Sequence, residues 1–178
     1  MPSMYRNIST GLWSAHQYFR NLSPRAKFVY LYLLTAPCSS ELSLFPFPLL
    51  FQTPSLGLKL EELEAVILAL EKEGLVIYDR ETEEILVCKY FENHKPNAGL
   101  TYEMYRNDLG EIKSEALIDE LVEISKNYTI SLAYYAALAD RRPYLENWET
   151  MNLFHFKDKE MKSLDEVRSA ASRGRASR

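Results

Sequence analysis

The stretch that decides the fold, residues 58–87, reads LKLEELEAVILALEKEGLVIYDRETEEILV. Apolar residues recur in it at helical spacing over 60–73, and Gly74 is well suited to ending a helix. Two apolar runs then flank the polar segment 79–84, which is the pattern of a β-hairpin with a short loop. The stretch therefore predicts a helix followed by a two-stranded hairpin.

The residues before this stretch predict two more helices and one strand. The Ser-Pro pair at 23–24 is a natural helix start, and the apolar spacing that follows must stop before Pro37. Prolines limit a short apolar strand at 44–47. A short helix is expected to begin within 49–51, with its length limited by Pro54 and a turn at Gly57. The order helix, strand, helix, helix, hairpin is that of a winged helix-turn-helix. We therefore expect a mainly α chain with a small β-hairpin.

The remainder of the chain predicts helices and a basic end. A proline and a glycine within 93–99 mark a candidate boundary, so residues 1–96 are expected to form the winged-helix domain. Helical spacing predicts a helical extension over 97–162. Residues 163–178 begin with capping-box spacing and end in Ser, Gly and Arg, which predicts a short helix and a disordered basic tail.

Composition limits the classes of protein to be considered. The 178 residues are 47% hydrophobic, so a packed core is expected, and the net charge of −4 means that nucleic-acid binding would need local basic patches. Cys38 and Cys88 lie far apart and outside any CxxC pair, which predicts two buried or half-buried thiols, with a disulfide or metal role as the alternative. No apolar run approaches the roughly 20 residues that span a bilayer. We expect a cytoplasmic protein without membrane contact.

Several short segments of the sequence resemble those of one protein family. They are Tyr5-Arg6-Asn7-Ile8-Ser9-Thr10, Leu22-Ser23-Pro24-Arg25-Ala26-Lys27, Leu31-Tyr32-Leu33-Leu34-Thr35-Ala36-Pro37, Glu73-Gly74-Leu75-Val76 and Asn93-His94-Lys95-Pro96-Asn97. With these segments in this order, the chain resembles the N-terminal domain of phage replisome organisers. These are winged-helix replication proteins related in architecture to DnaD, the primosome-loading protein of Gram-positive bacteria. The resemblance implies a role in starting DNA replication, by binding origin DNA and recruiting a helicase or helicase loader, and it implies no catalysis.

The helix that would read DNA departs from this pattern. Lys59 stands where a capping Ser or Thr is usual, so the helix start is weakly specified. Over 59–73 two lysines face five glutamates, and the hairpin loop 79–84 is acidic too. A helix in the major groove needs Arg, Lys, Asn or Gln, whereas phosphates repel glutamates. The centre of the helix is apolar nearly all round, which favours burial against protein. The expected homo-oligomer interface is Val66, Ile67, Leu68 and Leu70.

If DNA is bound, the basic N-terminal region is expected to contact it. Residues 1–40 contain no Asp or Glu, and Arg6 lies in an expected extended arm. Ordinary surface charge is the alternative for every candidate. The candidate DNA-binding residues are Arg6, Arg20, Arg25, Lys27, Lys59, Arg80, Lys89 and Lys95.

Catalysis finds no support in the sequence. His16, His94 and His155 are scattered, and there is no HExxH, Walker or GxSxG motif. No catalytic residue, metal ligand or cofactor is therefore expected. The leading hypothesis is a noncatalytic DNA-binding protein of phage-type replication initiation. The alternative is a winged-helix scaffold for oligomerisation or protein interaction, with weak or no direct DNA binding.

Overall fold

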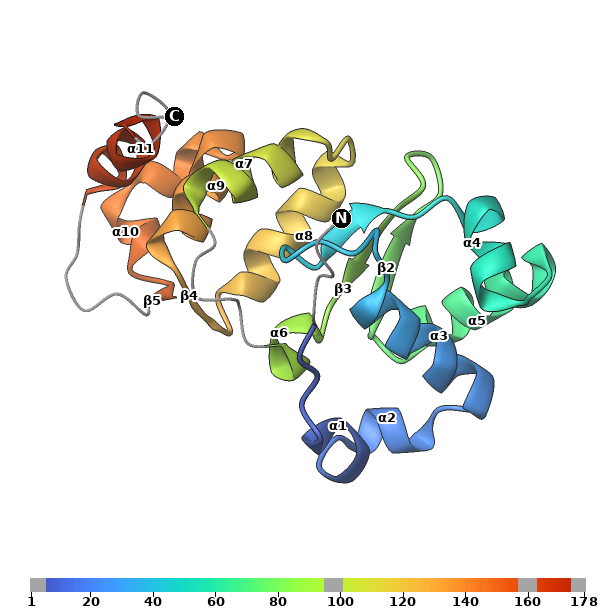
Figure 1. The fold of residues 1–178 in the computed structure, drawn as a ribbon. Helices are drawn as coiled ribbons and strands as arrows, with labels where there is room; N and C mark the ends of the chain where they lie inside the picture. Colours follow the sequence, from blue (N-terminus) through green and yellow to red (C-terminus); the bar gives the residue numbers. More distant parts are fainter. Residues whose placement is uncertain (1–5, 95–100, 157–162, 174–178) are drawn as a thin grey trace. The chain divides into compact units, whose positions relative to one another are not determined.

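The computed structural model describes residues 6–94, 101–156 and 163–173. The chain is mainly helical with a small antiparallel sheet, as the sequence predicts. It divides into two compact units, which we call unit 1 (residues 1–96) and unit 2 (residues 97–178) (Figure 1).

Unit 1 holds a three-stranded antiparallel sheet with the strand order β1-β3-β2. The predicted hairpin is present as β2 and β3, and β1 pairs with the far side of β3. Figure 1 shows α3, α4 and α5 gathered beside this sheet. The elements of unit 1 are α1 (Gly11–Ser14), α2 (Gln17–Asn21), α3 (Pro24–Thr35), β1 (Leu44–Pro46), α4 (Leu49–Leu56), α5 (Leu60–Lys72), β2 (Val76–Asp79), β3 (Glu84–Val87) and α6 (Tyr90–Asn93).

The ends of α3 and α5 are set by local side-chain and backbone hydrogen bonds. Ser23 Oγ accepts the Ala26 N–H at 3.2 Å, so α3 begins where the sequence predicts. At α5 a Glu62 carboxylate oxygen accepts the Lys59 N–H at 3.0 Å, which compensates for lysine as a poor N-cap. Gly74, with φ +65°, ends this helix in the left-handed conformation that glycine tolerates best.

The core of unit 1 lies between α3, α5 and the sheet. Leu63, Ile67 and Leu70 of α5 are essentially inaccessible to solvent, as are Val29 and Leu33 of α3. Their spacing of three or four residues places them on one face of each helix. This packing fixes which face of α5 remains in water.

Unit 2 is built around α9, which packs against α7, η1 and α11. Ser131 caps α9, and residues 134–139 within the helix are all buried. The sequence predicts helices over 115–126 and 130–140, but it gave no indication of α7 or of the parallel pair formed by β4 and β5. The elements of unit 2 are α7 (Tyr102–Gly110), α8 (Glu115–Ser125), β4 (Thr129–Ile130), α9 (Leu132–Arg141), the 3₁₀ helix η1 (Pro143–Glu146), α10 (Trp148–Met151), β5 (His155–Phe156) and α11 (Leu164–Arg173).

The expected short helix near the C-terminus is α11, which packs against α9 and α7. Arg168 holds it in place through ion pairs with Asp140 at 2.7 Å and Glu146 at 2.8 Å. Arg168 is therefore committed to the fold of unit 2. The sequence predicts that the basic tail begins at residue 170, which is wrong for residues 170–173, because α11 extends to Arg173. The rest of the expected tail lies outside the described residues.

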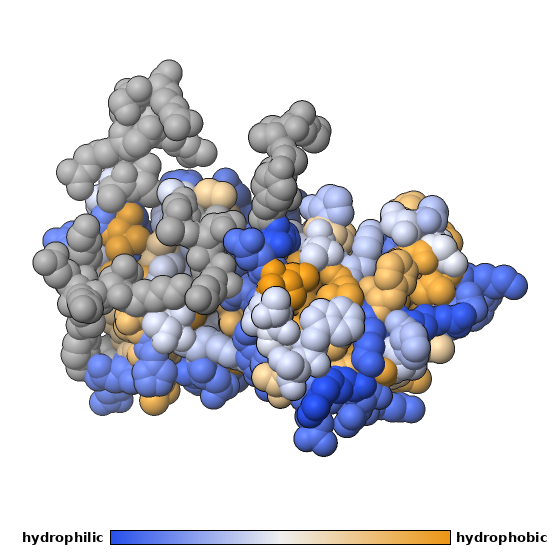
Figure 2. Space-filling model, turned by 60° about the horizontal axis from the view of Figure 1, so that its bottom comes forward, coloured by the Kyte–Doolittle hydropathy of each residue, from blue (hydrophilic) through white to orange (hydrophobic). Residues whose placement is uncertain are grey.

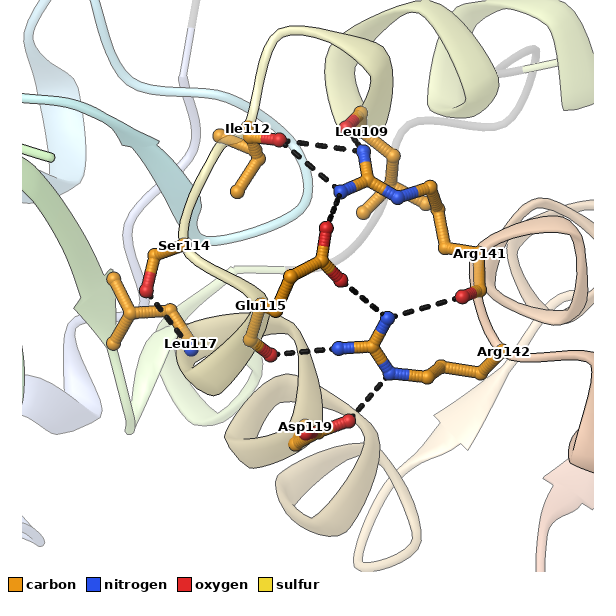
Figure 3. Close-up of polar contacts among 8 residues, drawn as sticks. All are labelled: Leu109, Ile112, Ser114, Glu115, Leu117, Asp119, Arg141 and Arg142. Carbon is orange, nitrogen blue, oxygen red and sulfur yellow. Dashed lines mark hydrogen bonds and ion pairs between the residues drawn. The ribbon is translucent and has the colours of Figure 1, made fainter.

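Two arginines at the end of α9 join it to the start of α8. Figure 3 shows Arg141 and Arg142 reaching the Glu115 carboxylate from two sides, at 2.6 and 2.5 Å. Arg142 also donates to Asp119, and Arg141 donates to the backbone carbonyls at the end of α7. The two guanidinium groups lower the pKa of Glu115. We call this cluster the arginine clasp.

Candidate functional site

A groove of about 750 Å³ lies between α4, α5 and the β2–β3 hairpin of unit 1. Its floor is formed by the buried side chains of Leu49, Ile67 and Tyr78. Its walls carry Leu50 from α4 and Leu68 from α5, which are 61% and 46% exposed. Single exposed leucines need no explanation, but two that line one apolar groove are typical of a binding surface.

Carboxylates border this groove. Glu61 and Glu64 come from α5 and Glu83 from the hairpin, against one cation, Arg80, among the lining residues. The Arg80 guanidinium donates to both oxygens of Glu71, at 2.8 and 3.3 Å, so its charge is locally offset. The groove is therefore apolar at its centre and acidic at its edge. Apolar residues also reach the surface in patches bordered by charged ones on the face drawn in Figure 2.

The expected oligomer interface needs correction. Val66, Ile67 and Leu70 are 7%, 1% and 0% exposed because they face the core of unit 1. Leu68 lies about 100° further round the helix from Ile67 and points to the groove. The helix is therefore amphipathic rather than apolar all round, and Leu68 alone of these four residues is available to a partner.

Arg6 is also not placed as the sequence predicts. Its side chain is 6% exposed and bonds to Glu41 at 3.2 Å, to the Tyr90 hydroxyl at 2.6 Å and to the Ser39 carbonyl at 2.5 Å. Instead of belonging to an extended arm, it ties the start of the chain to two distant segments. A phosphate could reach it only after these bonds were broken.

Three of the six other candidate DNA contacts in the described part of unit 1 are engaged with acids. Arg25 pairs with Glu62 at 3.0 Å and Lys89 with Glu92 at 3.0 Å, and Arg80 is held by Glu71. Lys59 is exposed at the start of α5, and Lys95 lies outside the described residues.

Arg20 and Lys27 remain. Arg20 is exposed, and Lys27 lies beside the aromatic pair formed by Phe19 and Trp13. Within the described residues neither cation forms an ion pair. Lys27 Nζ lies 5.9 Å from the centre of the Phe19 ring, and Trp13 packs edge-on against the same ring at 5.0 Å. Trp13 is 58% exposed, and Phe28, next to Lys27, is 50% exposed. We call Trp13, Arg20, Lys27 and Phe28 the basic–aromatic surface.

His94 and the two cysteines lie in surroundings that indicate a structural role. His94 is buried, stacks on Tyr90 with ring centres 4.4 Å apart, and lies 3.0 Å from the Leu34 carbonyl through Nε2. Burial lowers its pKa. Cys38 and Cys88 are half-buried, as the sequence predicts, and are not joined in a disulfide. Among the residues that the structure describes, no group of three or more His, Cys, Asp or Glu side chains could hold a metal ion.

Unit 2 has a hollow of its own, of about 620 Å³, which the sequence did not indicate. The Tyr102 hydroxyl donates to Asp140 there, and Asp140 also accepts from Arg168. Because these groups satisfy one another, we read them as anchors of α11 rather than as a catalytic set.

No protein-family model, curated protein or solved structure matches this chain. No helix within residues 6–94, 101–156 and 163–173 has the length and apolar character needed to cross a membrane.

Proposed function

We propose that unit 1 is a winged-helix domain and that the chain is a noncatalytic protein of phage-type DNA replication initiation. Two observations support this assignment. The helix–strand–helix–helix–hairpin order is accompanied by the strand order β1-β3-β2, in which the first strand pairs with the second strand of the hairpin. The segments that resemble replisome organisers fall in the same order along unit 1.

Within that role, α5 binds protein rather than the major groove of DNA. The observation that carries this step is the composition of its exposed face, where Glu61, Glu64 and Leu68 lie together on the groove. A helix with this face would bring carboxylates against phosphates and an apolar side chain against base edges. The same face suits a protein surface that supplies apolar contacts and positive charge.

Surface binding to purified replication proteins tests this role. The replicative helicase and helicase loader of the host would be immobilised in turn, and wild-type protein compared with Leu68→Glu. We expect binding to one of them, weakened about tenfold or more by the change, because it places a charge in an apolar contact. Leu153→Glu is the matched control, since Leu153 is 55% exposed in unit 2. Equal binding by wild type and both variants would refute the role of α5.

The basic–aromatic surface supports DNA binding as a second candidate function. Single-stranded nucleic acid binds where bases stack on exposed aromatic rings beside cations. Trp13, which is 58% exposed, and Lys27 both contact the buried ring of Phe19. No acid occurs in residues 1–40, although Glu62 and Glu92 approach from elsewhere in unit 1.

Fluorescence anisotropy with a random duplex and a single strand, at two salt concentrations, tests the DNA role. We expect binding that weakens steeply with salt and that is lost in the double variant Arg20→Gln, Lys27→Gln. Lys72→Gln, an exposed lysine at the end of α5, serves as control. The absence of binding at low salt would remove this candidate.

A further inference from the structure

We propose that the groove of unit 1 takes a basic amphipathic helix of a partner protein, with the leucines or similar residues of that helix between Leu50 and Leu68. The inference rests on the proposed protein-binding role of α5 and adds the chemistry of its partner. Three arguments lead to it: the shape of the groove, its charge, and the poor fit of that charge to a second copy of the chain or to DNA.

The shape suits a helix. The groove runs beside residues 60–68 of α5, which extend over about 13 Å, or two and a half helical turns. Its floor is closed by Leu49, Ile67 and Tyr78, and Leu50 and Leu68 stand on its two sides. An amphipathic helix reads such a groove with side chains at spacings of three, four and seven residues.

The charge of the groove selects a basic helix. Glu61 and Glu64 on α5 and Glu83 on the hairpin place carboxylates on both sides of the apolar floor. Among the described residues, the carboxylates of Glu61 and Glu64 form no hydrogen bond or ion pair, although the charge of Glu64 raises the pKa of Arg80. Both carboxylates are therefore available to a partner. Arg80 opposes them in sign, but Glu71 binds it at 2.8 Å. Lysines or arginines flanking the apolar stripe of the partner would meet these acids.

The same charges disfavour the other occupants. In a two-fold dimer built on this groove, Glu61 and Glu64 of one copy would face those of the other, because an isologous contact pairs a surface with itself. The helix α11 of the chain itself carries as many acids as arginines, is packed on α9 and has Arg168 paired with Asp140 and Glu146. DNA would meet the acids with its phosphates.

A displayed peptide library provides the test. Its members share a leucine-bearing helical stripe, and their flanking positions vary among Lys, Arg, Glu, Asp and Ser. The full chain serves as bait, and peptides that bind Leu68→Glu equally well are discarded. We expect the remaining peptides to be enriched in Lys and Arg at the flanks. Enrichment of neutral or acidic flanks, or no peptide that prefers the wild type, would overturn the proposal.

The strongest peptide is then measured by fluorescence anisotropy against charge variants. Glu61→Lys with Glu64→Lys should weaken it about tenfold or more and should improve binding of the same peptide with glutamate at its flanks. Glu73→Lys with Glu81→Lys is the matched control, because both glutamates are exposed, lie outside the groove and give the same change in net charge. Equal weakening by this control would show that the effect comes from net charge alone and would also overturn the proposal.

Two further readouts separate failure of this inference from failure of the proposed function. Self-association in sedimentation velocity that Leu68→Glu abolishes, without selection of basic peptides, would make a second copy the occupant. In that case α5 still binds protein, and the partner chemistry proposed here is wrong. If no variant on the α5 face changes peptide binding, self-association or helicase and loader binding, the protein-binding role itself fails.

Discussion

Replacing Arg6 with methionine tests whether this residue holds unit 1 together or waits for DNA. The side chain is 6% exposed and makes three charged hydrogen bonds, to Glu41, the Tyr90 hydroxyl and the Ser39 carbonyl. Methionine keeps most of the apolar stem but removes the Arg6 guanidinium from Glu41, which is 12% exposed. Removing one partner of a buried ion pair costs about 3–5 kcal/mol, and one hydrogen bond to a charged group about 1.5–3 kcal/mol. Since Glu41 keeps some contact with water, we expect a loss of about 3 kcal/mol.

Urea unfolding followed by circular dichroism and tryptophan fluorescence measures this loss. Arg20→Met is the control, because Arg20 is exposed and its replacement should change the free energy of unfolding by less than about 0.5 kcal/mol. Glu41→Gln in the Arg6→Met background should recover about 1 kcal/mol or more, since the uncompensated charge is then gone. If Arg6→Met is as stable as Arg20→Met but loses DNA binding, Arg6 is a phosphate contact as the sequence predicts, and our reading of its burial is refuted.

Three further changes test other parts of the fold. Burial lowers the pKa of His94, so its contribution to stability is complete above the ordinary histidine pKa of about 6.5 and is lost as pH falls through the lowered value. In urea unfolding, His94→Gln should therefore reduce the change in the free energy of unfolding between about pH 7 and pH 5. An unchanged pH dependence would contradict this. Gly57 has φ +63°, so Gly57→Ala should lower the free energy of unfolding by about 1 kcal/mol. Gly110→Ala should be neutral or stabilising, because Gly110 is helical and the space around an added Cβ is open. Thermal denaturation compares the two variants, and equal effects would refute the conformational argument. Arg142→Met should lower the free energy of unfolding by about 1–2 kcal/mol above pH 5 and by less at about pH 3.5. The reason is that the pKa of Glu115 is lowered in the folded chain, so the stability that its ion pair with Arg142 supplies is lost as pH falls through that lowered pKa. A loss that is independent of pH would show that packing, not charge, stabilises the arginine clasp.

The sequence predicts the elements whose signals are local. Ser23 with Pro24 starts α3, Ser114 starts α8, and the two apolar runs that flank the polar segment 79–84 indicate the hairpin. Each signal involves residues within a few positions of one another, so no knowledge of the fold is needed to read it. The strand order β1-β3-β2 is different, since pairing of β1 with β3 joins residues about forty positions apart.

The site residues were predicted less well because their partners are distant in sequence. Arg6 appeared free because residues 1–40 contain no acid, yet Glu41 lies just beyond that window and Tyr90 lies 84 positions away. The composition of residues 66–70 alone suggests a helix that is apolar all round, because composition does not show which helix face each residue occupies. Leu63, Val66, Ile67 and Leu70 share one face, and that spacing was visible in the sequence. The basic–aromatic surface depends on Phe19 bringing Trp13 and Lys27 together, which no local pattern indicates.

The glutamates of α5 fall into two groups, those that bond within unit 1 and those that do not. This difference helps to indicate which kind of partner the helix binds. Glu62 accepts the Lys59 N–H, and Glu71 accepts the Tyr78 N–H and holds Arg80, so both stabilise unit 1 itself. Glu61 stands in the first turn, where the helix dipole favours a carboxylate by a few tenths of a kcal/mol. Glu64 has neither a cap position nor a bonded partner among the described residues, and it faces the groove. If α5 had to enter a phosphate-lined groove, replacing Glu64 with glutamine would remove a repulsion and strengthen DNA binding. If the groove receives a basic helix, the same replacement weakens that contact and leaves DNA binding unchanged.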